Sequence, residues 1–147
     1  MSDIDTLRRM LTTNANQIGR HWRRVAHEVV FAHGITDAAA LPFITISRLG
    51  DGVRQLDLAE AVGLEGASLV RLLDQLCGAG LVERREDASD RRAKMLFLTD
   101  SGRTLALQIE QELVALRERV FGGVSVEDLE ATLRVFRVIE EAANRTE

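Results

Sequence analysis

The segment DLAEAVGLEGASLVRLLDQLC, residues 57–77, decides the fold of this chain. Asp57 and Glu60 have the spacing of a capping box, which predicts the start of a short helix that Gly63 ends. After a tight turn, leucines recur at i, i+3, i+4 and i+7 in residues 68–77, and this period predicts a second helix with one apolar face. Two short helices joined by a glycine-containing turn predict a helix-turn-helix.

Two short strand-like segments follow the second helix directly. Residues 81–85 and 94–99 are short strand-like runs, and the connection between them, residues 86–93, is charged. Such a pattern predicts a hairpin with a projecting loop. A helix-turn-helix followed by this hairpin is a winged helix, a fold whose usual ligand is duplex DNA.

Longer helices are predicted on the N-terminal side. Apolar residues in residues 4–33 recur in steps of three and four, as on one face of a long helix. A further helix, capped by Thr36 or Asp37, is predicted to reach Leu49. Pro42 falls inside this helix, and because it removes a hydrogen bond it either delays the start or kinks the helix.

The C-terminal part of the chain predicts two more helices, separated by Gly122 and Gly123. The first is capped by Thr99 or Asp100 and the second by Ser125. Each carries apolar residues at helical spacing along one face, so each has a stripe to bury against a partner.

Together these elements predict a mainly α fold with a small β-hairpin, in which residues 35–99 form a winged helix-turn-helix flanked by long helices. The composition agrees: 147 residues with 46% hydrophobic residues exclude a disordered chain. No apolar run of about 18 residues predicts a membrane span, and the acidic start of the chain does not read as a signal peptide. The single cysteine, Cys77, cannot form an intramolecular disulfide, so a reducing cytoplasm is expected.

Candidate DNA-binding side chains lie on the polar face of the second helix and on the hairpin loop. Ser68 and Arg71 fall near the start of that helix with Gln75 on the same face, and an arginine matches the O6 and N7 acceptors of guanine. Residues 84–94 hold five basic and three acidic residues, a net charge of +2 in a chain of −4. A cationic loop is typical of a probe of phosphates or of the minor groove. The alternative for Arg71 taken alone is a solvated helix arginine. The alternative for the cluster Asp90-Arg91-Arg92 taken alone is a surface loop whose charges pair with one another.

Four segments resemble the MarR family of winged-helix regulators, most closely its SlyA-type branch. They are Leu69–Leu76, Gly80–Val82, Ala88–Lys94 and Leu98–Thr99, within a match over about residues 55–105. The resemblance implies an obligate homodimer whose first and last helices interlock, and therefore a helical dimerisation region at residues 1–34 and 100–147.

The resemblance also implies roles for individual side chains. Arg71 is expected to contact a base or a phosphate, and Asp90 to orient Arg92 into the minor groove, with Arg91 beside them. Which of the two wing arginines enters more deeply stays open. The full set of expected DNA contacts is Ser68, Arg71, Gln75, Asp90, Arg91, Arg92 and Lys94.

Many relatives in this family bind a small aromatic or phenolic acid between the dimerisation helices and the winged helix. In this chain Arg20, Arg24 and His27 are candidates to receive a carboxylate, with Trp22 or Phe43 as an apolar wall. The alternative is a solvated basic face, with the tryptophan in the dimer interface. The chain departs from the SlyA-type pattern where it reads Ala-Ala-Ala-Leu-Pro at positions 38 to 42, since relatives often carry an aromatic there. A pocket of different size, or none, therefore remains open.

No cofactor, metal or catalytic centre is expected. His21, His27 and His33 are six residues apart, so no pair has the i, i+4 spacing of a helical zinc site. Cys77 is read as a small packing residue and not as a redox sensor. The sequence thus predicts not an enzyme but a dimeric regulator, most often a repressor, bound to an inverted-repeat DNA operator. The alternatives are an architectural or anti-silencing DNA binder without a ligand, and a protein-interaction winged helix that has lost DNA binding.

Overall fold

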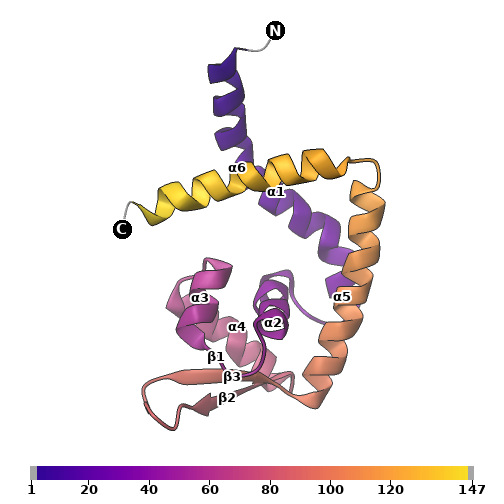
Figure 1. Cartoon of the computed structure of the whole chain (residues 1–147). Coiled ribbons are helices and arrows are strands. Elements are labelled where there is room, and N and C mark those ends of the chain that lie inside the picture. The colour runs from indigo at the N-terminus through magenta and orange to yellow at the C-terminus, as the bar shows by residue number, and fades with distance from the viewer. Residues whose placement is uncertain (1–2, 146–147) are drawn as a thin grey trace. The chain divides into compact units, whose positions relative to one another are not determined.

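The computed structural model describes residues 3–145 and places six helices and three short strands in this part of the chain (Figure 1). The chain divides into two compact units, the first ending at Leu113 and the second beginning at Val114. The elements are α1 (Ile4–Phe31), α2 (Asp37–Leu49), β1 (Val53–Arg54), α3 (Gln55–Val62), α4 (Gly66–Gly78), β2 (Val82–Glu86), β3 (Lys94–Leu98), α5 (Asp100–Phe121) and α6 (Val126–Asn144).

The predicted winged-helix architecture is confirmed, and its sheet has one strand more than the expected hairpin. The strands are antiparallel in the order β1-β3-β2, and Val53 of β1 pairs with Leu96 of β3. Because β1 has only two residues and its partner lies far along the chain, no local alternation reveals it.

The predicted capping box at the start of α3 is wrong. The helix begins two residues earlier, at Gln55, and its N-cap residue Arg54 makes no side-chain cap hydrogen bond. Asp57 lies instead in the first turn, where its charge complements the helix dipole. The end is as predicted, since Gly63 adopts the left-handed conformation at φ +67° that a glycine accommodates without strain.

Helix α2 starts at the predicted cap, where the hydroxyl of Thr36 accepts a hydrogen bond from the backbone N–H of Ala39. Pro42 does not delay this start, so the first of the two alternatives, a late start, is wrong. The proline lies inside the helix and is buried. Because proline has no backbone N–H, position 42 cannot donate the helical hydrogen bond to the carbonyl of Ala38.

The core of the first unit lies between α2, α4 and the sheet. Helix α2 packs against α3 and α4, and α4 packs against β2. Fully enclosed side chains come from each of these elements: Phe43, Ile46, Leu58, Leu69, Leu73 and Leu96. Gly102 lets α5 begin against this body, because an added Cβ there would lie 2.1 Å from the carbonyl oxygen of Leu81.

The apolar stripes of α1 and α6 are uncovered in the single chain. On α1, Leu7 and Ile18 are 50% and 57% exposed, and on α6, Leu133 and Phe136 are 53% and 45% exposed. Helix α6 has no buried residue along its described length. Apolar faces of this length on long helices require a partner surface. Within residues 3–145, none of the helices is both long and apolar enough to cross a membrane.

Candidate nucleic-acid interface

The recognition helix α4 turns its leucines inward and its polar residues outward. Leu69 and Leu73 are fully buried, whereas Ser68, Arg71 and Gln75 are exposed together on the opposite face. The helix starts at Gly66, two residues before its predicted start, so these side chains occupy its first three turns. Within residues 3–145 the Arg71 guanidinium forms no hydrogen bond or ion pair, which leaves its donors available to a ligand.

Arg84 of β2 joins this strand to the recognition helix α4 through two contacts. Its Nη1 lies 2.6 Å from a carboxylate oxygen of Asp74, and its Nη2 donates to the carbonyl of Val70 at 3.0 Å. Asp74 is the only acidic residue of α4, so this ion pair neutralises the one negative charge that the helix carries. No local sequence pattern indicates Arg84 as part of the site, because both of its partners belong to another element.

The wing is the loop of residues 87–93 between β2 and β3. Its tip is folded by Asp90, whose carboxylate accepts a hydrogen bond from the backbone N–H of Arg92 at 3.0 Å. Asp90 therefore acts on Arg92 through the backbone, and within the described residues neither the Arg91 nor the Arg92 guanidinium has a partner. Both arginines are exposed.

The other basic side chains of the hairpin are held by neighbours. Lys94 faces Glu86 across the two strands at 3.4 Å, in the register that pairs these residues. Arg85 lies 2.8 Å from Glu83 and stacks over the ring of Phe97, 4.2 Å from its centroid. The hairpin thus presents its unpaired positive charge at the tip, where a groove of DNA is reached first.

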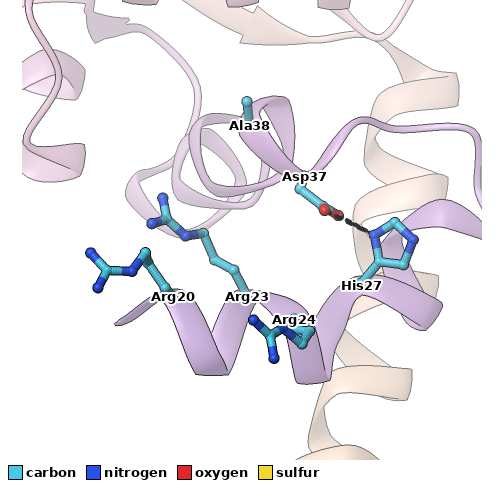
Figure 2. Close-up of a pocket in the computed structure, with 6 residues that line it drawn as sticks. All are labelled: Arg20, Arg23, Arg24, His27, Asp37 and Ala38. Atoms are coloured by element: carbon cyan, nitrogen blue, oxygen red, sulfur yellow. Dashed lines mark hydrogen bonds and ion pairs between the residues drawn. The ribbon is translucent and has the colours of Figure 1, made fainter. Parts of the chain in front are cut away.

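A second basic region lies between α1 and the start of α2. A depression of about 470 Å³ is lined there by Arg20, Arg23 and Arg24 of α1 and by Asp37 and Ala38 of α2. Figure 2 draws these residues. Nδ1 of His27 lies 2.8 Å from each carboxylate oxygen of Asp37 (Figure 2). Three arginines line the depression against one carboxylate, which is already paired with His27, so the lining carries a net positive charge that attracts a small anion.

Of the predicted ligand-site residues, Arg20, Arg24 and His27 line this one depression. Phe43 does not line the depression, since it is fully buried in the core. Trp22 does not line it either, because two residues after Arg20 a side chain points to the opposite face of a helix. Arg23 was missed, although its spacing of three from Arg20 places it on the same face.

Cys77 is half-buried at the end of α4. Burial raises the pKa of its thiol above the usual value, with smaller opposing effects from Arg84. A thiol that stays protonated at neutral pH is a poor nucleophile, in agreement with a packing role. No group of three His, Cys, Asp or Glu side chains among residues 3–145 is arranged to hold a metal ion.

Fold and site together define a winged-helix protein with exposed arginines on α4 and at the wing tip. A sequence model of the MarR family matches residues 33–93. The chain is also 32% identical to the transcriptional regulator PA3341, whose crystal structure superposes with a TM-score of 0.82 over 91% of this chain and 98% of that one. The chain belongs to the MarR family, and its relatives are transcriptional regulators.

Two further solved structures share the fold. A mutant MarR from E. coli complexed with operator DNA has a TM-score of 0.78 at 19% identity and covers 94% of this chain and 99% of its own. CouR from Rhodococcus jostii RHA1 bound to p-coumaroyl-CoA has a TM-score of 0.74 at 22% identity. The match covers 85% of this chain and 87% of the CouR chain. At these identities the likeness establishes the fold.

The Arg84–Asp74 pair leads to a first prediction. Arg84→Ala is expected to weaken specific DNA binding about tenfold, because the exposed Asp74 carboxylate then loses its neutralising cation and repels the phosphates of a bound duplex. Fluorescence anisotropy with a labelled duplex measures the change, and a thermal melt by circular dichroism checks that the variant is folded.

The matched control is the double variant Arg84→Ala with Asp74→Ala, which removes the exposed carboxylate as well. It is expected to recover most of the lost affinity. Recovery of none would mean that Arg84 contacts the DNA itself, contrary to the role assigned here.

Proposed function

We propose that this protein is a homodimeric, sequence-specific transcriptional repressor of the SlyA-type branch, bound to an inverted-repeat operator. One observation carries the proposal: Arg71 on the exposed face of α4 and Arg91 and Arg92 at the wing tip are cations without a partner among the described residues. They stand on a chain whose net charge is −4. A local cationic surface on an anionic protein favours a specific polyanionic ligand over non-specific coating of nucleic acid.

Residues 35–99 form the DNA-binding region in this proposal. Ser68, Arg71 and Gln75 enter the major groove, where a bidentate arginine contributes about 1–3 kcal/mol of discrimination between bases. Arg91 and Arg92 enter the adjacent minor groove. Asp90 fixes the wing tip and Lys94 contacts a phosphate.

Residues 1–34 and 100–147 form the dimerisation region. The support is the uncovered apolar stripe on each of α1 and α6, which a second copy of the chain buries. A two-fold dimer presents two recognition helices related by symmetry. It therefore reads half-sites about one helical turn apart in an inverted repeat.

A small anion, aromatic or otherwise, is the proposed effector, held in the depression by Arg20, Arg23, Arg24 and His27. Phe31, stacked on His27 with ring centroids 5.3 Å apart, offers an apolar surface in place of Phe43 and Trp22. CouR, which has the same fold, binds p-coumaroyl-CoA. A ligand that binds one arrangement of the recognition helices more tightly than the other shifts the population and releases the operator.

The test is a fluorescence anisotropy titration with a duplex from upstream of the protein's own gene and with a scrambled duplex. Tight binding to the first alone is expected, weakening with salt by a slope of about −0.9 per phosphate contact. Aromatic carboxylates added to the complex are then expected to lower the anisotropy. Equal binding to both duplexes would favour an architectural role, and no binding at low salt would favour a protein-interaction role.

A further inference from the structure

Hydrogen bonds of Asp87, the first residue after β2, stabilise the base of the wing. One carboxylate oxygen accepts hydrogen bonds from the backbone N–H and the hydroxyl of Ser89, at 3.0 and 2.8 Å. The other accepts from Nη2 of Arg54 at 2.9 Å. The backbone N–H of Asp87 donates to the carbonyl of Ala93 at 3.1 Å and closes the loop. Both ends of the wing therefore meet at Asp87, one through its carboxylate and the other through its backbone N–H.

Asp87 is ionised at neutral pH. The backbone N–H of Ser89 makes the largest contribution to lowering the pKa of this carboxyl, followed by the Ser89 hydroxyl and, more weakly, by Arg54. The Asp87 side chain is 14% exposed and that of Arg54 is 53% exposed. The acid is thus enclosed at the wing base and the arginine reaches it from outside.

Arg54 belongs to a different part of the winged helix. It ends β1, where it pairs with Met95 of β3, and it is the residue before α3. In the strand order β1-β3-β2, β1 and β2 form opposite edges of the sheet. The wing loop begins at the end of β2, so it starts from the edge opposite to Arg54. The Arg54 side chain consequently connects the base of the wing to the opposite edge of the sheet and to the start of α3.

We propose that Arg54 and Asp87 are positioning residues that hold the wing in the orientation in which Arg91 and Arg92 meet DNA. The inference rests on the proposed function, since it concerns how the wing is presented to a groove. Residues 88–92 carry the two free guanidinium groups on a short exposed loop. A loop that is ordered before binding loses less conformational entropy when the complex forms. The smaller entropic cost increases the affinity for DNA.

A simpler electrostatic role makes the opposite prediction. If Asp87 is only a negative charge near DNA, its removal strengthens binding, because phosphate repulsion is lost. If it positions the wing, its removal weakens binding although the protein becomes more positive. The sign of the change therefore separates the two roles.

The variants are Asp87→Asn, Arg54→Gln and their combination, measured by anisotropy on the specific duplex at several salt concentrations. Asparagine keeps an acceptor for Ser89 and loses the ion pair with Arg54. Each single variant is expected to bind about fivefold to tenfold more weakly with an unchanged salt slope, and the double variant no worse than either. Glu86→Gln removes an equal charge from the exposed end of β2 and is the matched control, expected to bind at least as tightly as the wild type.

Hydrogen exchange of the free protein supplies a readout that does not depend on DNA. Amides of residues 88–92 are expected to exchange faster in Asp87→Asn than in the wild type or in Glu86→Gln. Unchanged exchange, or tighter DNA binding by Asp87→Asn, would overturn the positioning role. A smaller salt slope in Arg54→Gln would instead make Arg54 a phosphate contact. Failure of the wild type to bind any duplex, with faster exchange in the variant, would count against the proposed function alone.

Discussion

Leu133→Asp is expected to convert the protein from a dimer to a monomer and to abolish specific DNA binding. Leu133 lies in the stripe of α6 and is 53% exposed in the single chain, and the proposed dimer would bury it. An aspartate at the centre of an apolar interface is an uncompensated buried charge, which costs roughly 3–5 kcal/mol. Two copies of the stripe face each other in a two-fold dimer, so the cost is incurred twice. Sedimentation velocity measures the state of association, and anisotropy measures the loss of DNA binding.

The matched control is Val138→Asp. Val138 is 65% exposed and lies five residues further along α6, on a different face of the helix. The same charge there is expected to leave the dimer intact. A stable dimer of Leu133→Asp would refute the assignment of α6 to the interface, and a monomeric wild-type protein would refute the dimer itself.

The elements that the sequence predicted correctly are those whose signals lie within a few residues. The Thr36 and Ser125 hydroxyls each accept a backbone N–H three residues on, as a cap requires. Gly63 ends α3 through its own backbone conformation. The two errors at β1 and at the start of α3 have one cause. Arg54 pairs with Met95, and this distant strand contact, which no local pattern encodes, sets where the helix begins.

The same distinction, between signals within a few residues and contacts between distant elements, applies to the candidate site. Arg71, Arg91 and Arg92 were predicted from their positions on a helix face and a loop tip, and the structure leaves all three exposed. Arg54 and Arg84 were not predicted, because each acts through a carboxylate on another element. A residue's type and helical phase indicate what it can bind, whereas its partners follow only from the tertiary fold.

Phe43 illustrates the limit for the ligand site. An aromatic residue near a basic face was a reasonable apolar wall on sequence alone. Phe43 and Ile46 on α2 instead share one core with Leu69 and Leu73 on α4, and the core takes precedence because burying a phenylalanine contributes about 1.5–3 kcal/mol. The basic residues of α1 therefore line, with the start of α2, a depression whose side chains are mainly polar.

Arg92→Ala is expected to lower the affinity for the specific duplex by about 1–3 kcal/mol, or roughly tenfold to a hundredfold, without unfolding the dimer. The Asp90 carboxylate holds the backbone N–H of Arg92, so the position of this residue in the wing is fixed before DNA arrives. Its guanidinium has no partner to lose among the described residues, so its removal affects the complex and not the fold. Anisotropy measures the affinity, and a thermal melt checks that stability is unchanged.

Two comparisons make the result specific to the wing. Arg8→Ala removes the same charge from an exposed position on α1 and is expected to leave binding unchanged. Arg92→Lys keeps the charge but loses the planar fork of donors, so it is expected to recover only part of the affinity if Arg92 enters a narrow minor groove. Full recovery by lysine would assign Arg92 to a phosphate and leave the groove to Arg91. Identical binding curves for Arg92→Ala and the wild type, with matching melts, would remove the wing from the interface altogether.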